Sequence, residues 1–446
     1  MTALLRNKAV IRDKISSSQV IFLFQRASEY DKTKYIMFID YKNNVFHIED
    51  VSMSSLAEQY PTPFYAYSQS SIQNAYRNCL NAYQNHGVDI HIHYAVKANT
   101  NKDIIKTLAD EGAGADVTSG GELMRALEGG VHPDKIIFSG VGKTRDELKL
   151  ALNKKIGQIN VESFNELKAL NHVASEQDDF NPNVCIRVNP DVDPKVHAKI
   201  STGKKQTKFG INHEEVPEIY KMGSEMAALN LCGIAAHIGS QVMAIETFEE
   251  EYKVLKQMGL DLRTQGLKVE RMDIGGGLGV DYSDCRNQPQ FDDWAKYAAK
   301  VFKDTDFHLA IEPGRSLVGQ SGIFVTRIIY IKESGGRKFA IVDGAMNDLL
   351  RPTLYDAYHQ ILPVKQSEGG ATEKYDVVGP VCETGDYFAL DRELTSELKE
   401  GDLLSIGSAG AYGHVMASTY NMRPLPAELL IHGKDVRVIQ PHRSPY

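Results

Sequence analysis

Between about residue 61 and residue 315, short apolar runs alternate with longer amphipathic stretches. The short runs are typical of buried strands and the longer stretches of helices that cover a sheet. We predict strands at 64–67, 90–96, 115–118, 136–139, 158–161, 184–188, 233–238, 271–274 and 308–311, with helices that include 71–83, 101–111, 120–129, 145–153, 163–174 and 247–265. Eight or nine strand–helix units favour an α/β fold whose parallel sheet closes into a (β/α)8 barrel over an open doubly wound sheet.

The rhythm changes on both sides of this region. After about residue 316, strand-like runs at 322–331, 338–342, 375–378, 402–406 and 429–432 predict a mostly β C-terminal domain. Two short strands in 36–51 and a short helix at 52–60, ended by Pro61, are predicted to join it. The expected domains are therefore a barrel at 61–315 and a β-rich domain at 36–60 and 316–446. Residues 1–35 are predicted to be a poorly ordered extension.

Composition excludes several classes of function. The 446 residues are 42% hydrophobic and carry a formal net charge of −8, so no general attraction for nucleic acid or for an anionic membrane is expected. No apolar run reaches the length of a membrane span. The five cysteines are dispersed and contain no Cys-x-x-Cys pair, which predicts reduced thiols in a cytoplasmic protein.

Polar residues recur where the predicted strands end, and barrel enzymes build their sites at that edge. Lys97 ends the second predicted strand and is followed by the turn signal Asn99-Thr100-Asn101. A lysine in this position can form a Schiff base with a carbonyl cofactor, or it can be an ordinary solvated charge. Similar positions are held by Asp116, His237, Ser240, the glycines 275–277 and the stretch from Glu312 to Arg315.

Several of these residues suit a phosphorylated, aromatic cofactor. Three consecutive glycines can let backbone N–H groups close around a phosphate, or they can form a tight turn. The spacing does not match a Gly-x-Gly-x-x-Gly dinucleotide motif. Glu312 can hold a pyridinium nitrogen protonated, and Arg315 can bind a carboxylate at two points; a structural ion pair is the alternative. His237 can lie flat against an aromatic ring or fill the core.

The second domain adds further candidates. Arg351 and Tyr355 are four residues apart and would share one face of a helix. Cys382-Glu383 offers a proton donor and a receptor for an ammonium group, although a free cysteine is more often buried filler. Tyr412 lies on a glycine-flanked loop. His91 and His93 have no carboxylate or cysteine nearby to complete a ligand set, so no metal is predicted.

Together these motifs resemble the fold-type III pyridoxal-phosphate-dependent decarboxylases, which have an alanine-racemase-like barrel. Within that family they are most similar to the decarboxylases of diaminopimelate. The resemblance covers about residues 38–430 and rests on motifs in the family's order, at 94–99, 114–122, 237–241, 275–277, 312–315, 351–355, 382–383 and 410–412. The stretch 205–210 also resembles the substrate-side loop of the family. The resemblance does not cover residues 1–35.

The resemblance implies a role for each matching residue. Lys97 would hold pyridoxal 5'-phosphate, with His237 stacked on its ring and Glu312 at the ring nitrogen. The other implied cofactor residues are Asp116, Ser240, Gly277, Pro313, Gly314, Arg315 and Tyr412. The substrate's distal end would meet Arg315, Arg351, Tyr355, Glu383 and Tyr412. Cys382 would return the proton after CO₂ leaves, and in this family Cys382-Glu383 reaches the barrel of a second subunit, so a homodimer with shared active sites is expected.

The leading hypothesis is decarboxylation of meso-diaminopimelate to L-lysine and CO₂, the last step of lysine biosynthesis. A substrate with a second amino-acid end needs a cation for its carboxylate and an anion for its ammonium, and Arg351 with Glu383 offers that pair. A decarboxylase of another basic amino acid, an amino-acid racemase of the same fold and a non-catalytic carrier of the cofactor are the alternatives.

Overall fold

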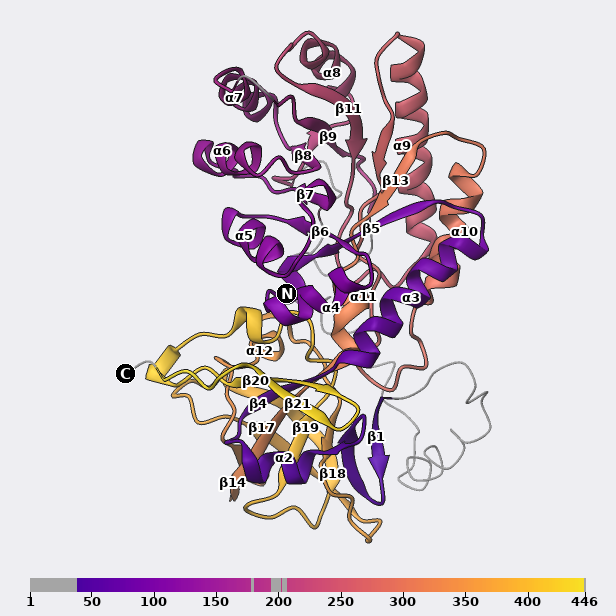
Figure 1. The fold of residues 1–446 in the computed structure, drawn as a ribbon. Coiled ribbons are helices and arrows are strands. Elements are labelled where there is room, and N and C mark those ends of the chain that lie inside the picture. The colour runs from indigo at the N-terminus through magenta and orange to yellow at the C-terminus, as the bar shows by residue number, and fades with distance from the viewer. Residues whose placement is uncertain (1–37, 178–179, 194–201, 203–206, 445–446) are drawn as a thin grey trace, which may run out of the picture.

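The computed structural model describes residues 38–177, 180–193, 202 and 207–444. The chain forms a barrel and a β-rich part that lie end to end, with the helices α4, α11 and α12 near their junction (Figure 1). Helix α4 comes after β5 and α11 comes after β13, so the residues that follow these strands lie at the junction. Helix α12 of the β-rich part lies there too.

Eight parallel strands close the predicted barrel. They follow chain order around the ring, from β5 to β9 and then β11 to β13, and β13 returns to pair with β5 through Leu309 and Ile90. Their bounds are Ile90–Ala95, Gly114–Val117, Ile136–Phe138, Gln158–Val161, Asn183–Asn189, Asn230–Ala235, Arg271–Asp273 and His308–Ile311. The short β10 (Ile211–Asn212) adds to the edge of β9. The prediction of a (β/α)8 barrel is confirmed.

Helices cover the outside of the barrel (Figure 1). They are α3 (Gln69–Asn85), α4 (Lys102–Asp110), α5 (Gly120–Glu128), α6 (Arg145–Asn153), α7 (Phe164–Ser175), α8 (Val216–Ser224), α9 (Glu246–Thr264), α10 (Phe291–Phe302) and α11 (Arg315–Val318). Ser119, Thr144 and Ser163 begin α5, α6 and α7, and each side-chain oxygen accepts a hydrogen bond from a backbone N–H three residues on. These caps fix where each helix starts after its strand. Helices α8 and α10 were not among the predicted segments.

Polar side chains cross the inside of the barrel. Strands β8 and β12 are not neighbours, yet Asn160 Nδ2 donates to Asp273 Oδ2 at 3.1 Å. Gln158 Nε2 donates to Asn160 Oδ1 at 2.9 Å, and Arg271 Nη1 donates to Gln158 Oε1 at 3.3 Å. This chain of hydrogen bonds satisfies polar groups that would otherwise be costly to bury.

The β-rich part contains a sheet in the order β18-β17-β15-β14-β4-β20-β21, with β19 and β16 branching from β14. Its strands are β4 (Phe64–Ser68), β14 (Gly322–Ser334), β15 (Arg337–Val342), β16 (Ile361–Pro363), β17 (Thr372–Val378), β18 (Tyr387–Thr395), β19 (Leu403–Ile406), β20 (Ala427–His432) and β21 (Asp435–Gln440). The prediction of a mostly β second part is confirmed.

A separate three-stranded sheet of β1 (Ile39–Lys42), β2 (Val45–Ile48) and β3 (Val51–Ser52) precedes α2 (Met53–Gln59). Phe46 N donates to Val364 O at 2.7 Å, so this sheet contacts the chain next to β16. Phe46, Ile48, Met53 and Leu56 share a buried cluster with Phe64 of β4.

The prediction of 64–67 as a barrel strand is wrong. Strand β4 pairs antiparallel with β14 and parallel with β20, in the β-rich sheet. All five of its residues are buried, and an apolar strand buried on both faces fits a barrel and a central sheet position equally well by pattern alone. The chain therefore enters the β-rich sheet first and begins the barrel only after α3.

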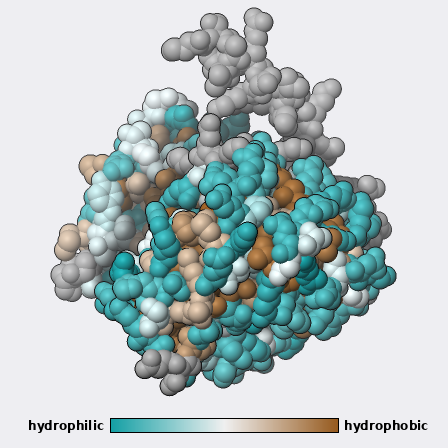
Figure 2. Space-filling model, turned by 90° about the horizontal axis from the view of Figure 1, so that it is seen from above, coloured by the Kyte–Doolittle hydropathy of each residue, from teal (hydrophilic) through white to brown (hydrophobic). Residues whose placement is uncertain are grey.

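The barrel surface opposite the β-rich part is mainly hydrophilic, with hydrophobic residues showing between hydrophilic ones (Figure 2). Among the described residues, no helix combines the length and apolar character that crossing a lipid bilayer requires.

Candidate active site

Lys97 stands in a single 3-10 turn, Val96–Ala98, directly after β5. Its Nζ lies 2.6 Å from Asp116 Oδ2 of the neighbouring strand β6, and Asp116 is fully buried. Burial acts to lower the pKa of Lys97, but the carboxyl groups of Asp116 and Glu312 outweigh it and raise the pKa above its usual value. The site therefore surrounds this amine with acidic groups.

Glu312 follows β13 and is buried beside two other carboxyl groups. Burial raises its pKa well above the usual range, and the neighbouring Asp116 and Asp273 raise it further. Asp273 accepts hydrogen bonds from Gly275 N at 3.0 Å and from Asn160 at 3.1 Å, which favour its charged form. Burial raises the pKa of Asp273 as well, so this cluster of carboxyl groups favours the protonated form more than exposed carboxyl groups do.

His237 follows β11 and is held by the glycine loop after β12. Gly276 N–H donates to His237 Nδ1 at 3.2 Å, so Nδ1 carries the lone pair and Nε2 the proton. Burial lowers the pKa of His237 well below its usual value, and the positive charges of Arg187 and Lys97 add to the effect. The imidazole is therefore neutral.

The three glycines join the loops that follow β11, β12 and β13. A Cβ on Gly276 would lie 2.1 Å from Glu312 O, and one on Gly277 would lie 2.0 Å from Gly239 O. Gly277 also has φ +102°, which side chains disfavour. Only glycine permits these backbones to meet, so the sequence requirement here is steric.

The loop after β13 is also packed against β5. Ala95 N donates to Pro313 O at 3.1 Å. A Cβ on Gly314 would lie 3.0 Å from Ala95 Cβ and 3.1 Å from Ala98 Cβ. These contacts fix the start of α11, and with it Arg315, against the turn that carries Lys97.

Arg315 is buried and faces the β-rich part. Its Nη2 donates to Ser240 Oγ at 3.0 Å, its Nη1 donates to Tyr282 OH, and its guanidinium lies 4.6 Å from the centre of the Tyr412 ring. Tyr412 N in turn donates to Ala98 O at 2.7 Å, one residue after Lys97. The Tyr412 loop is thus attached to the Lys97 turn.

Helix α12 (Arg351–Tyr355) presents the next pair, and the predicted helical spacing is confirmed. Arg351 and Tyr355 both line a cavity of about 480 Å³, together with Ser240, Tyr282, Arg315, Tyr412 and eight other residues. Arg351 is buried, with its guanidinium 4.2 Å from the centre of the Tyr282 ring. Lys97 is not among the lining residues; Arg315 and Tyr412 connect the two groups.

Glu428 of β20 ties the β-rich part to the barrel. It accepts hydrogen bonds from Tyr67 OH at 2.6 Å and from Asn101 Nδ2 at 2.9 Å. Asn101 is the residue that caps α4, four residues after Lys97. The orientation of the Lys97 turn therefore depends on both parts of the chain.

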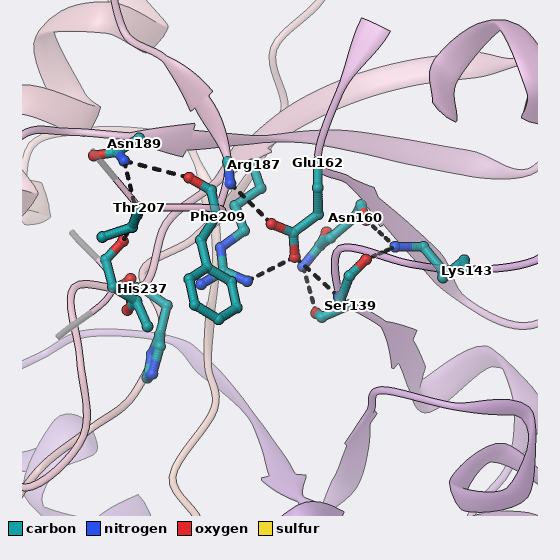
Figure 3. A network of polar contacts seen from close by, with 12 residues as sticks. Ser139, Lys143, Asn160, Glu162, Arg187, Asn189, Thr207, Phe209 and His237 are labelled. Carbon is teal, nitrogen blue, oxygen red and sulfur yellow. Dashed lines mark hydrogen bonds and ion pairs between the residues drawn. The ribbon is translucent and has the colours of Figure 1, made fainter. Parts of the chain in front are cut away.

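A further polar network lies on the barrel rim (Figure 3). Glu162 accepts hydrogen bonds from Arg187 Nη1 at 2.7 Å, from Gly140 N at 3.0 Å and from Gly210 N at 2.9 Å. The guanidinium of Arg187 lies 4.9 Å from the centre of the Phe209 ring. Glu162 was not among the predicted site residues, although it follows strand β8 directly, as other rim residues follow their strands. The expected substrate-side stretch 205–210 falls partly outside the described residues.

Cys382 and Glu383 lie away from both groups. Both are exposed; Cys382 N donates to Asn421 Oδ1 at 3.2 Å, and Glu383 accepts a hydrogen bond from Tyr420 OH. Neither lines the cavity. In this chain, the pair therefore lies outside both the Lys97 cluster and the cavity.

The residues around Lys97 suit pyridoxal phosphate. Asp116 Oδ1 and Arg315 Nε are buried, and neither has a hydrogen-bond partner among the described residues. The site thus combines an amine, a neutral imidazole, a carboxyl group with a raised pKa and a glycine loop whose backbone an anion can approach. That donor set fits the aldehyde, ring, ring nitrogen and phosphate of this cofactor.

Comparison with known proteins agrees with this chemistry. The family model described as "Pyridoxal-dependent decarboxylase, pyridoxal binding domain" matches residues 69–319. The chain therefore belongs to the pyridoxal-dependent decarboxylases.

Its relatives are more specific. A diaminopimelate decarboxylase of Zymomonas mobilis is 44% identical over 405 residues, which cover 90% of this chain and 95% of that protein. The crystal structure of diaminopimelate decarboxylase from Helicobacter pylori, complexed with L-lysine, is 39% identical with a TM-score of 0.83, covering 88% and 96% of the two chains. The enzyme from M. jannaschii in co-complex with L-lysine is 36% identical with a TM-score of 0.86, covering 91% and 95%.

Proposed function

We propose that this protein decarboxylates meso-diaminopimelate to L-lysine and CO₂, the last step of lysine biosynthesis. The observation that carries the proposal is the pair of buried guanidinium groups, Arg315 and Arg351, in a cavity next to the Lys97 cluster. Neither arginine has a carboxylate ion-pair partner among the described residues. Two buried guanidinium groups that form no ion pair suit a substrate that brings its own carboxylate.

We further propose that pyridoxal 5'-phosphate is the cofactor. Lys97 would bind its aldehyde, His237 would lie against its ring, and Glu312 would face the ring nitrogen. The phosphate would meet Ser240, Gly277 and the backbone from Glu312 through Pro313 and Gly314 to Arg315, with Tyr412 nearby. When bound, the cofactor supplies an electron sink for the pair of electrons left by the departing carboxylate.

The chain's own residues prepare each step. Glu312, whose pKa is raised by burial and by the neighbouring carboxyl groups, would face the ring nitrogen and could share a proton with it. Asp116 accepts a hydrogen bond from the Lys97 amine through Oδ2, while its Oδ1 has no hydrogen-bond partner among the described residues. The carboxylate could therefore take a proton from an amine at this position. Arg315, Arg351 and Tyr355 orient the distal carboxylate, which places the other carboxylate at the reacting end.

The proton that replaces CO₂ is proposed to come from a second subunit. Cys382 of the partner subunit would donate its Sγ proton to the carbon, and the partner's Glu383 would bind the distal ammonium. The exposure of both side chains in one subunit supports this arrangement. A cytoplasmic homodimer is therefore proposed, in agreement with five free cysteines.

Incubation of the purified protein with cofactor and meso-diaminopimelate tests the activity. One L-lysine and one CO₂ should appear per substrate consumed. Absence of lysine, together with rapid turnover of ornithine or arginine, would assign the chain to decarboxylation of another basic amino acid. An Arg351→Ala variant with undiminished activity would point the same way.

The role of Lys97 has its own optical test. The holoenzyme should absorb near the visible edge of the ultraviolet, and borohydride should remove that band by reducing the carbon–nitrogen double bond to Lys97. A Lys97→Ala variant should lack the band. Persistence of the same band in that variant contradicts the assignment.

A further inference from the structure

His359 is a buried residue that no motif marks, and it contacts the proposed substrate site from behind. It follows α12, is fully buried, and its Nε2 lies 2.8 Å from Arg351 Nη1. On its other side, His359 Nδ1 lies 2.8 Å from Gly407 O. The imidazole therefore bridges the arginine and a backbone carbonyl.

The two contacts determine where the ring proton lies. A carbonyl oxygen can only accept, so Nδ1 carries the proton and donates it to Gly407. Nε2 then has the lone pair and accepts from Arg351, which can only donate. Burial lowers the pKa of His359 to about 3, and the positive charge of Arg351 contributes to the shift. The imidazole is neutral throughout the physiological range.

A neutral acceptor differs from the usual partner of a buried arginine. A carboxylate would orient the guanidinium and also cancel its charge, whereas an imidazole orients it and leaves the charge in place. The guanidinium of Arg351 stacks at 4.2 Å on the Tyr282 ring, and the His359 ring meets the same tyrosine edge-on at 4.9 Å. These contacts hold Arg351 rigidly while its charge stays available to a ligand.

We propose that His359 is a positioning residue for substrate specificity: it orients Arg351 toward the cavity and, as a neutral acceptor, reserves the arginine's charge for the distal carboxylate of the substrate. The inference rests on the proposed function and deepens it, because it assigns selectivity for a carboxylate-bearing amine to a residue that does not touch the substrate.

The test compares two ligands that differ only in that carboxylate. L-lysine carries it, and cadaverine is the same diamine without it. Their dissociation constants are measured on the holoenzyme by calorimetry, and KM and kcat are measured for meso-diaminopimelate. Three variants are needed: His359→Leu removes the acceptor, His359→Gln keeps a neutral acceptor and donor, and His359→Glu places an anion against Arg351.

The Leu variant loses a hydrogen bond to a charged group, and the Glu variant cancels the charge of Arg351. We therefore expect L-lysine to bind about 10- to 100-fold more weakly to both. The KM for meso-diaminopimelate should rise in parallel, with a smaller change in kcat. Cadaverine binding should stay within about twofold in every variant, since it makes no contact that needs Arg351. The Gln variant should bind L-lysine within about threefold of wild type.

A purely structural role for His359 predicts a different pattern. Damage to the fold weakens L-lysine and cadaverine together, and such parallel loss overturns the inference, as does unchanged lysine binding in the Glu variant. If the Leu variant does not fold, the Gln and Glu pair decides, because the two differ in charge and hardly in shape. A wild-type enzyme that releases no lysine from meso-diaminopimelate overturns the proposed function instead, while the two ligand titrations still decide the role of His359.

Discussion

The side chains around Lys97 are acidic, whereas the charged residues that line the neighbouring cavity of 480 Å³ are Arg315, Arg351 and a single carboxylate, Asp281. Neither arginine forms an ion pair with a carboxylate among the described residues. The two ends of the site therefore have opposite electrostatic character. An acidic surround keeps proton acceptors beside the amine, and a cationic end selects an anionic group. The pKa of each group and the charge that it offers a ligand are therefore set by the side chains around it.

Glycine at 277 is expected to be irreplaceable even by alanine. A Gly277→Ala variant combines a positive φ with a Cβ 2.0 Å from Gly239 O, so we expect the free energy of unfolding to fall by about 1–3 kcal/mol. Cofactor release, followed by absorbance during dialysis, should be faster. Gly142→Ala is the control, because nothing lies within 4 Å of the added Cβ. Equal behaviour of the two variants would contradict the steric account of the glycine loop.

Asp348 is expected to make stability depend on pH. Burial raises its pKa from 3.8 to about 7. Because the folded pKa is the higher one, its contribution to stability is complete below about pH 4 and is lost as the pH rises through 7, by up to about 4 kcal/mol. In Asp348→Asn this titration is absent. Between pH 4 and pH 8, the Tm of the wild type should therefore fall relative to the Tm of Asp348→Asn. A difference in Tm that stays constant over this range would refute the assignment.

At the scale of elements, the order of strands around the barrel could be predicted because each strand is followed by an amphipathic helix. The bounds of β8 and β13 agree with the predicted 158–161 and 308–311. Strand β4 could not be assigned to the β-rich sheet from the sequence. It is buried on both faces, and that pattern is the same for a barrel strand and for a central strand of another sheet. The candidate residues at strand ends were found by position, but His359 was not, because its partners Arg351 and Gly407 come together only in the folded chain.

The link between β20 and the barrel should be essential for stability. In Glu428→Ala, Tyr67 OH and Asn101 Nδ2 lose their buried acceptor, and we expect a loss of about 2–5 kcal/mol. Urea unfolding monitored by circular dichroism gives this value. Glu393→Ala, on an exposed position of β18, should unfold like wild type. A Glu428→Ala variant as stable as the control would show that the link is dispensable.

At the scale of the whole molecule, the proposed site requires two subunits. Lys97→Ala and Cys382→Ala variants should each be inactive alone. After mixing under conditions that exchange subunits, half of the dimers are mixed, and each mixed dimer has one site with both Lys97 and Cys382. Activity should return to about a quarter of the wild-type value. No recovery despite proven exchange would place both residues in the same subunit's site.

Strand β4 sets the order in which a newly made chain can mature. It leaves the ribosome early, but its neighbours β14 and β20 begin only at Gly322 and Ala427. All barrel strands are complete by Ile311, so the barrel can close while both edges of β4 still lack partners. A nascent chain that stops before β20 therefore leaves one edge of an apolar strand open to aggregation, which makes the pairing of β20 (Ala427–His432) with β4 the step that completes the sheet.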